Sequence, residues 1–69
     1  MKIGVKPFEV AVYEGSKKVN SIGIDRIKNV YMEDKKVILE ILHNQIMKTF
    51  TISKVQRPKY LFQDILYHL

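Results

Sequence analysis

Short segments in which apolar and polar residues alternate, joined by turns of a few residues, constrain this fold more than any other feature. Residues 8–13 (FEVAVY) alternate as a half-buried strand does, and EGSKK at 14–18 predicts a turn in which Gly15 takes a positive φ. Further extended stretches are predicted at 19–24, 28–33, 37–42 and 46–53. A parallel crossover needs about a dozen residues, so strands joined this closely pair antiparallel.

The segment from Gly23 to Ile27 has two interpretations. It forms either a short turn or a short helix from Asp25, and Gly23 marks a bulge or a bend ahead of it. Hairpin turns are predicted at EDKK (33–36) and HNQ (43–45). Because each reversal sends the next turn to the opposite end of the sheet, the conformation near Asp25 decides which turns share an end.

A helical period replaces the strand pattern after Pro58, which suits a first helical turn because its missing N–H needs no partner there. Four apolar residues then fall at i, i+3, i+4 and i+7, namely Phe62, Ile65, Leu66 and Leu69. We expect a helix that begins near Arg57 and buries this stripe, with Leu61 at its flank, against a sheet. Asp64 and His68, four residues apart, predict a surface ion pair on that helix.

These patterns predict an α+β fold in a single small domain of residues 1–69: a four- to five-stranded antiparallel sheet, or a small open barrel, with one C-terminal helix packed on it. Residues 37–42 (VILEIL) carry apolar groups for both faces, so the sheet either curls into a barrel or covers its second face with a partner. The chain has no cysteine, which excludes a disulfide framework and a thiolate metal site. Oligomerisation remains as a means of stabilising so short a chain.

The composition favours an anionic partner. Twelve Lys and Arg residues against seven Asp and Glu give a formal charge of +5, which attracts nucleic acid, anionic surfaces or acidic proteins. Ten of the twelve are Lys, which contacts phosphate as a point charge, whereas base readout relies on Arg. No apolar run approaches the roughly 18 residues of a membrane span, and the N-terminus lacks a signal-peptide core, so we expect a cytoplasmic protein without a membrane partner.

No motif for catalysis, metal binding or cofactor binding stands out. His43 and His68 are 25 residues apart and outside any ligand motif, and Glu33 and Asp34 are adjacent charges in a turn. There is no G-x-S-x-G motif and no glycine-rich phosphate loop. We therefore expect a non-enzymatic binding module without a cofactor or metal.

The segment ISKVQRPKYLF (52–62) is the strongest candidate site. Three cations, Lys54, Arg57 and Lys59, surround the expected helix start beside Tyr60, where helix N–H groups also favour an anion. Cations next to an aromatic ring fit a site for phosphate and a stacked base. Four lysines are predicted at two hairpin tips, namely Lys17, Lys18, Lys35 and Lys36. They either contact phosphate as well or simply keep solvent-exposed strand edges from pairing with other chains.

Our leading hypothesis is a small basic nucleic-acid-binding or regulatory protein. The alternative is a protein-protein interaction module, such as a small regulator, an inhibitor or a dimerising subunit, that uses an exposed apolar sheet face. The residues predicted for that face are Tyr13, Tyr31, Ile38 and Leu42, which otherwise line the inside of a closed barrel. A partner protein or a second copy in a homodimer would cover this face.

The stretches GSKKVNSIGIDRIKNVYMEDKKVILEIL and FTISKVQRPKYLFQDIL, between Gly15 and Leu66, resemble in spacing the first part of a LytTR-type DNA-binding domain. That family places an apolar, acidic D-x-I segment before a strand, followed by two strands and a short helix. The family's later His-x-Ser segment has no counterpart in this sequence. The resemblance implies no role for any individual residue.

Overall fold

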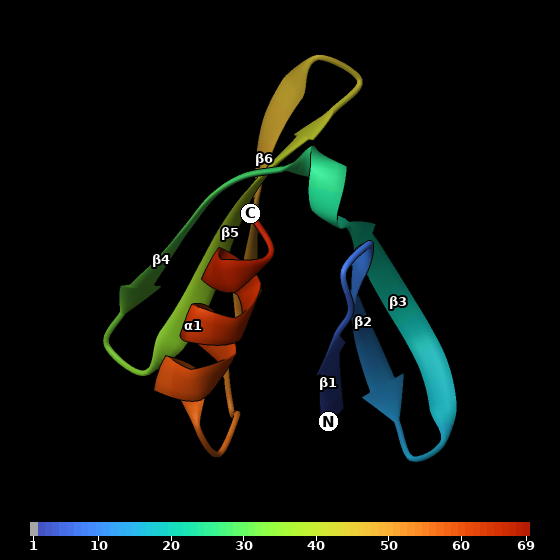
Figure 1. The fold of residues 1–69 in the computed structure, drawn as a ribbon, viewed down its shortest axis with the longest axis vertical. Helices are drawn as coiled ribbons and strands as arrows, with labels where there is room; N and C mark the ends of the chain where they lie inside the picture. Colours follow the sequence, from blue (N-terminus) through green and yellow to red (C-terminus); the bar gives the residue numbers. More distant parts are fainter. Residues whose placement is uncertain (1) are drawn as a thin grey trace.

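The computed structural model describes residues 2–69, which form two three-stranded antiparallel sheets and one α-helix (Figure 1). The first sheet consists of β1 (Lys2–Val5), β2 (Glu9–Glu14) and β3 (Lys17–Gly23), in that order. A short 3-10 helix, η1 (Ile24–Arg26), leads into the second sheet of β4 (Ile27–Glu33), β5 (Lys36–His43) and β6 (Ile46–Ile52). Helix α1 (Pro58–Tyr67) follows.

The predicted α+β class, antiparallel pairing and C-terminal helix are confirmed, but the strand arrangement is corrected. Instead of four to five strands in one sheet or open barrel, residues 2–69 form six strands in two sheets. Periodicity does not reveal β1 because Gly4 interrupts its four residues; β1 pairs with β2, with Ile3 opposite Val12. The division into two sheets arises at η1, where the chain turns away and β4 pairs only with β5.

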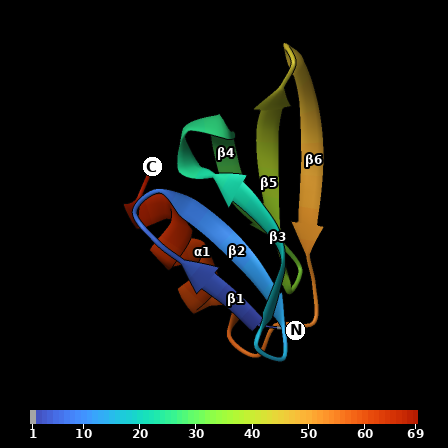
Figure 2. The ribbon, with the colours of Figure 1, turned by 90° about the vertical axis from the view of Figure 1, so that its right-hand side faces the viewer.

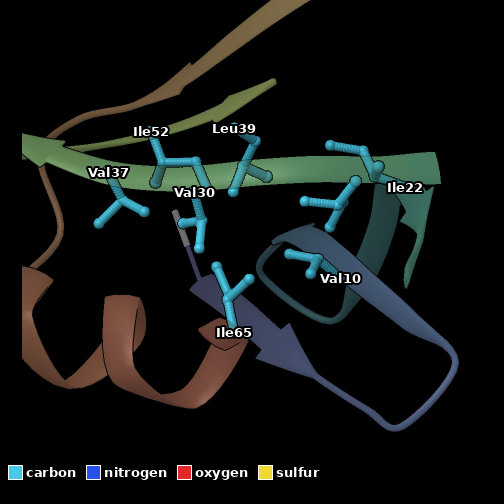
Figure 3. Close-up of a cluster of buried hydrophobic side chains, with 8 residues drawn as sticks. Val10, Ile22, Val30, Val37, Leu39, Ile52 and Ile65 are labelled. Atoms are coloured by element: carbon cyan, nitrogen blue, oxygen red, sulfur yellow. The ribbon is translucent and has the colours of Figure 1, made fainter. Parts of the chain in front are cut away.

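One apolar core joins the two sheets and the helix (Figure 3). Its labelled residues are Val10 and Ile22 from the first sheet, Val30, Val37, Leu39 and Ile52 from the second, and Ile65 from α1. Full burial of such a side chain contributes about 1.5–3 kcal/mol. Strand β5 supplies one of its two apolar faces to this core, and its other face, which includes Ile38, lies on the outer side of the second sheet.

The turns form where they are predicted, and of the two alternatives at Gly23, a bulge or a bend, the structure has the bend. Positive φ angles are found at Gly15 (63°), Asp34 (60°), Asn44 (52°) and Gln45 (65°). Glycine, aspartate and asparagine tolerate this left-handed region better than other residues do. The β2–β3 register shifts between Val12 and Tyr13, whereas Gly23 marks the bend into η1. A Cβ at Gly23 would lie 2.7 Å from Oδ1 of Asp25, so a larger residue there would displace that carboxylate.

Helix α1 begins at Pro58, one residue from the predicted start, and buries only part of the predicted stripe. The apolar residues that pack against the core are Leu61, Phe62 and Ile65. Leu66 and Leu69, predicted to be buried, are 50% and 49% exposed. The reason is tertiary: α1 contacts β4 and β5 of one sheet and β1 of the other, so its buried face is the narrow one between them.

The predicted ion pair between Asp64 and His68 does not form. Nδ1 of His68 lies 2.9 Å from the backbone oxygen of Asp64, because this C-terminal side chain reaches a backbone carbonyl of the preceding turn. Among residues 2–69, no helix has the length and apolar character needed to span a bilayer.

Candidate nucleic-acid interface

Three separate connections of the chain lie at one end of the molecule, spread across its width (Figure 1). Figures 1 and 2 both show the β2–β3 turn, the β4–β5 turn and the segment 53–57 at this end, opposite the tip of the β5–β6 hairpin. The cause is η1, which adds a reversal between β3 and β4. The predicted basic segments therefore share an end, as the sequence requires if an extra reversal occurs near Asp25.

Six exposed cations belong to these connections, and we call this surface the basic end: Lys17, Lys35, Lys36, Lys54, Arg57 and Lys59. Within residues 2–69, no carboxylate oxygen lies within 4.0 Å of any of these six charges. Glu14, Glu33 and Asp34 belong to the same turns, so the cations outnumber the anions there by two to one. The basic end thus carries a net positive charge that is not consumed by close ion pairs.

Lys18 is the predicted site residue that the structure separates from the others. Its Nζ donates to Oε2 of Glu9 at 2.6 Å, and Glu9 also lies 3.8 Å from Nζ of Lys6. The hydrogen bond to Glu9 raises the pKa of Lys18 above its usual 10.5, because the carboxylate favours the charged ammonium. The charge of Lys18 is therefore balanced within the protein, whereas Lys17, opposite Glu14 in the register, has no carboxylate oxygen within 4.0 Å in residues 2–69.

The backbone at Lys54 is in the left-handed region, with a φ of 62°. A residue with a Cβ is disfavoured there by about 1–2 kcal/mol relative to glycine. The chain nevertheless places a lysine at this position, and its side chain is exposed. The backbone strain at Lys54, which Gln45 shares at a φ of 65°, is thus accompanied by an exposed positive charge.

Arg57 and Tyr60 form a cation–π pair at the start of α1. The Cζ atom of Arg57 lies 5.8 Å from the centroid of the Tyr60 ring, and the tyrosine is 67% exposed. Such a contact holds a guanidinium over one part of a ring while leaving the remainder of the aromatic surface accessible. The pair places a guanidinium, which can donate hydrogen bonds to an anion, beside an exposed aromatic ring.

The first turn of α1 adds positive potential to the same place. No side chain caps the helix, its first turn contains no acidic residue, and Pro58 occupies the first helical positions. The dipole of the helix therefore adds to the charges of Arg57 and Lys59 instead of being offset by a carboxylate. This arrangement is unfavourable for the isolated helix and favourable for a bound anion.

A groove of about 410 Å³ lies between β1 and the start of α1. Its polar rim includes Lys2, Lys54 and Gln56, and its floor includes Ile3 and Leu61. Sequence reasoning missed Lys2 and Gln56 because it did not identify β1, the strand that brings Lys2 beside the segment 53–57. Residues 2–69 contain no group of three residues able to hold a metal ion.

The residues of the alternative interface are divided between the sheets. Tyr31, Ile38 and Leu42 share the outer face of the second sheet, with Tyr31 opposite Ile38, whereas Tyr13 belongs to β2. Tyr31 and Leu42 are each 36% exposed, and Ile38 only 7%. Met47, opposite Leu42 and 53% exposed, extends this face and was not in the predicted set. The outer face is partly apolar and is not the interior of a barrel.

Comparisons of the chain with protein-family models, with curated proteins and with solved structures find no match. The resemblance in spacing to a LytTR-type domain is thus not accompanied by a family match. The proposals below rest on the residues of this chain alone.

Proposed function

We propose that this protein is a non-enzymatic module of the cytoplasm that binds nucleic acid through the phosphates at its basic end. The observation that carries the proposal is that three separate connections bring six exposed cations to one end of the molecule. In residues 2–69, none of these cations has a carboxylate oxygen within 4.0 Å. Lysines make five of the six charges, which suits contacts to phosphate more than contacts to base edges. Binding is therefore expected to depend little on sequence.

The dimensions of the molecule are compatible with several simultaneous contacts. The backbone measures 32 × 27 × 19 Å along its principal axes, and the basic end lies across the 27 Å direction in Figure 1. At 3.4 Å per base step, this width corresponds to roughly eight steps of one strand. Cations distributed over such a width can contact several phosphates at once.

Single-stranded nucleic acid fits the segment 53–60 better than a duplex does. The exposed Tyr60 ring offers a stacking surface only to an unpaired base, and the Arg57 guanidinium beside it reaches a neighbouring phosphate. Duplex binding relies on the lysines alone. We expect both forms to bind and the single strand to bind more tightly.

The test is the salt dependence of binding, measured by fluorescence anisotropy with a labelled single strand and with a duplex of the same length. If six phosphates are neutralised, the slope of log affinity against log salt concentration is about −4 to −5. Tyr60→Ala should weaken single-strand binding more than duplex binding. An affinity that does not change with salt would contradict the proposal.

The outer face of the second sheet supports a second candidate, a protein-interaction module. Tyr31, Leu42 and Met47 give this face partly exposed apolar side chains on three neighbouring strands. Exposed apolar patches often mark interfaces between proteins. Sedimentation of the intact protein separates this candidate from the first, because a stable oligomer is expected only if this face is covered.

A further inference from the structure

A second group of cations faces a cavity near the opposite end of the molecule. The cavity has a volume of about 400 Å³ and lies between β3, η1 and the β5–β6 hairpin. Figures 1 and 2 both show that this hairpin extends beyond the first sheet, and residues from both of its strands line the cavity. Ile41 and Phe50, both half-buried, form part of an apolar floor.

Three basic side chains line this cavity from three different elements. Arg26 comes from η1, His43 from β5 and Lys48 from β6. Nη1 of Arg26 lies 3.5 Å from Nδ1 of His43. The two side chains therefore lie next to each other on the wall of the cavity.

No acidic residue lines the cavity. The other polar groups along its wall are Asn20, Ser21 and Thr49, which are neutral. Within residues 2–69, Arg26 and Lys48 have no carboxylate oxygen within 4.0 Å. Two exposed cations without a close carboxylate therefore lie beside the apolar side chains of Ile41 and Phe50, a combination that suits an anion with an apolar body.

We propose that this cavity binds a small organic anion, a phosphate or carboxylate joined to an apolar ring or chain. Arg26 and Lys48 contact the anionic group, and the apolar body lies on Ile41 and Phe50. The guanidinium fork suits both phosphate and carboxylate oxygens. A volume of about 400 Å³ is within the range of small-molecule sites. The site is separate from the basic end, so its occupation is independent of nucleic-acid binding.

The first experiment uses anilinonaphthalene sulfonate as the anionic probe and N-phenylnaphthylamine, which has the same rings without the sulfonate, as its neutral match. We expect the sulfonate to bind at least about tenfold more tightly, because hydrogen bonds to charged groups are lost in the neutral probe. Backbone amide NMR should place the shifts on η1, β5 and β6. Equal affinity of the two probes, or shifts confined to the basic end, would overturn the proposal.

The second experiment compares two double variants of equal charge. Arg26→Gln with Lys48→Gln removes both cavity cations and should lower the affinity for the sulfonate by roughly tenfold or more. Lys35→Gln with Lys36→Gln removes the same charge from the basic end. This variant should keep its affinity for the sulfonate within about twofold of the original, since separated exposed charges are screened by salt. All four side chains are exposed, so both variants are expected to fold, and thermal unfolding checks this. Equal effects of the two variants would refute the assignment.

Competition then distinguishes the two sources of the anion. Phenyl phosphate, benzoate and benzyl alcohol share one aromatic ring and differ in the attached group. Displacement of the sulfonate by phenyl phosphate alone assigns a phosphate ligand, and displacement by benzoate alone assigns a carboxylate ligand. Displacement by benzyl alcohol to the same extent would show an apolar pocket without anion recognition and would end the proposal.

Discussion

The basic end and the cavity near the opposite end carry their cations differently. At the basic end the cations belong to three separate exposed connections, whereas Arg26 and Lys48 line a cavity together with the apolar Ile41 and Phe50. Charges spread over an exposed end suit a long polyanion that makes many weak contacts. Charges gathered around a cavity suit one small anion that is partly removed from water. The same residue types therefore support different ligands, and the difference lies in the shape of the surface that carries them.

Helix α1 packs against both sheets and so fixes the position of the basic end relative to the cavity. Ile65 is fully buried in the core that joins both sheets. Ile65→Ala should lower the free energy of unfolding by about 2–5 kcal/mol, a large share for so small a domain. Leu66→Ala, next along the helix and 50% exposed, should change it by only about 0.5 kcal/mol. Urea unfolding followed by circular dichroism measures both, and equal losses would mean that α1 packs differently.

Charge reversal at either end should separate the two binding activities. Lys54→Glu with Arg57→Glu should weaken nucleic-acid binding by about tenfold or more, because two phosphate contacts become repulsive. Arg26→Glu with Lys48→Glu should instead abolish binding of the sulfonate probe and change nucleic-acid affinity much less. Fluorescence anisotropy measures the nucleic-acid affinity of each variant, and probe fluorescence measures its affinity for the sulfonate. A basic-end variant that keeps its nucleic-acid affinity would contradict the leading proposal, and retention of a protein partner by that variant would favour the alternative.

Strain at Lys54 offers a sharper test of the basic end. Lys54→Gly removes a Cβ from a backbone with a φ of 62° and should raise the free energy of unfolding by about 1 kcal/mol. The same change should weaken nucleic-acid binding, because it removes a cation. Asn44→Gly, at a φ of 52° near the other end, is the control: asparagine already tolerates this region, so little stability is gained. A loss of stability in Lys54→Gly would show that the lysine side chain itself stabilises the fold.

The outer face of the second sheet gives the smallest expected effect on stability. Leu42→Gln with Met47→Gln alters two partly exposed side chains, 36% and 53% accessible, and should change the free energy of unfolding by about 0.5 kcal/mol or less per site. Sedimentation velocity should give the same mass for this variant and the original protein. An oligomer that dissociates in the variant would instead support the protein-interaction candidate.

Local rules accounted for much of the fold and part of the candidate site. The turns at Gly15, Asp34 and Asn44 follow from residues that tolerate a positive φ, and the helix follows from Pro58 and the apolar period after it. The segment containing Arg57 was identifiable because its cations and aromatic ring are neighbours along the chain. Each of these features depends on contacts between residues a few positions apart.

Other features depended on residues distant in the sequence. Periodicity did not reveal β1, whose four residues are defined by pairing with β2, or the exposure of Leu66, which depends on where both sheets meet α1. The pairing of Lys18 with Glu9 and the contact of Arg26 with His43 join residues 9 and 17 positions apart.

Closely connected antiparallel strands, a helix after Pro58 and a surplus of positive charge all follow from the order of the residues along the chain. The division of the strands into two sheets, the common end of the basic turns and the cavity shared by Arg26 and Lys48 follow from packing between distant segments. The two groups of features differ in the range of the forces that produce them. Backbone sterics and hydrogen bonding act between neighbours, whereas the packing of apolar faces against one another decides which distant side chains meet.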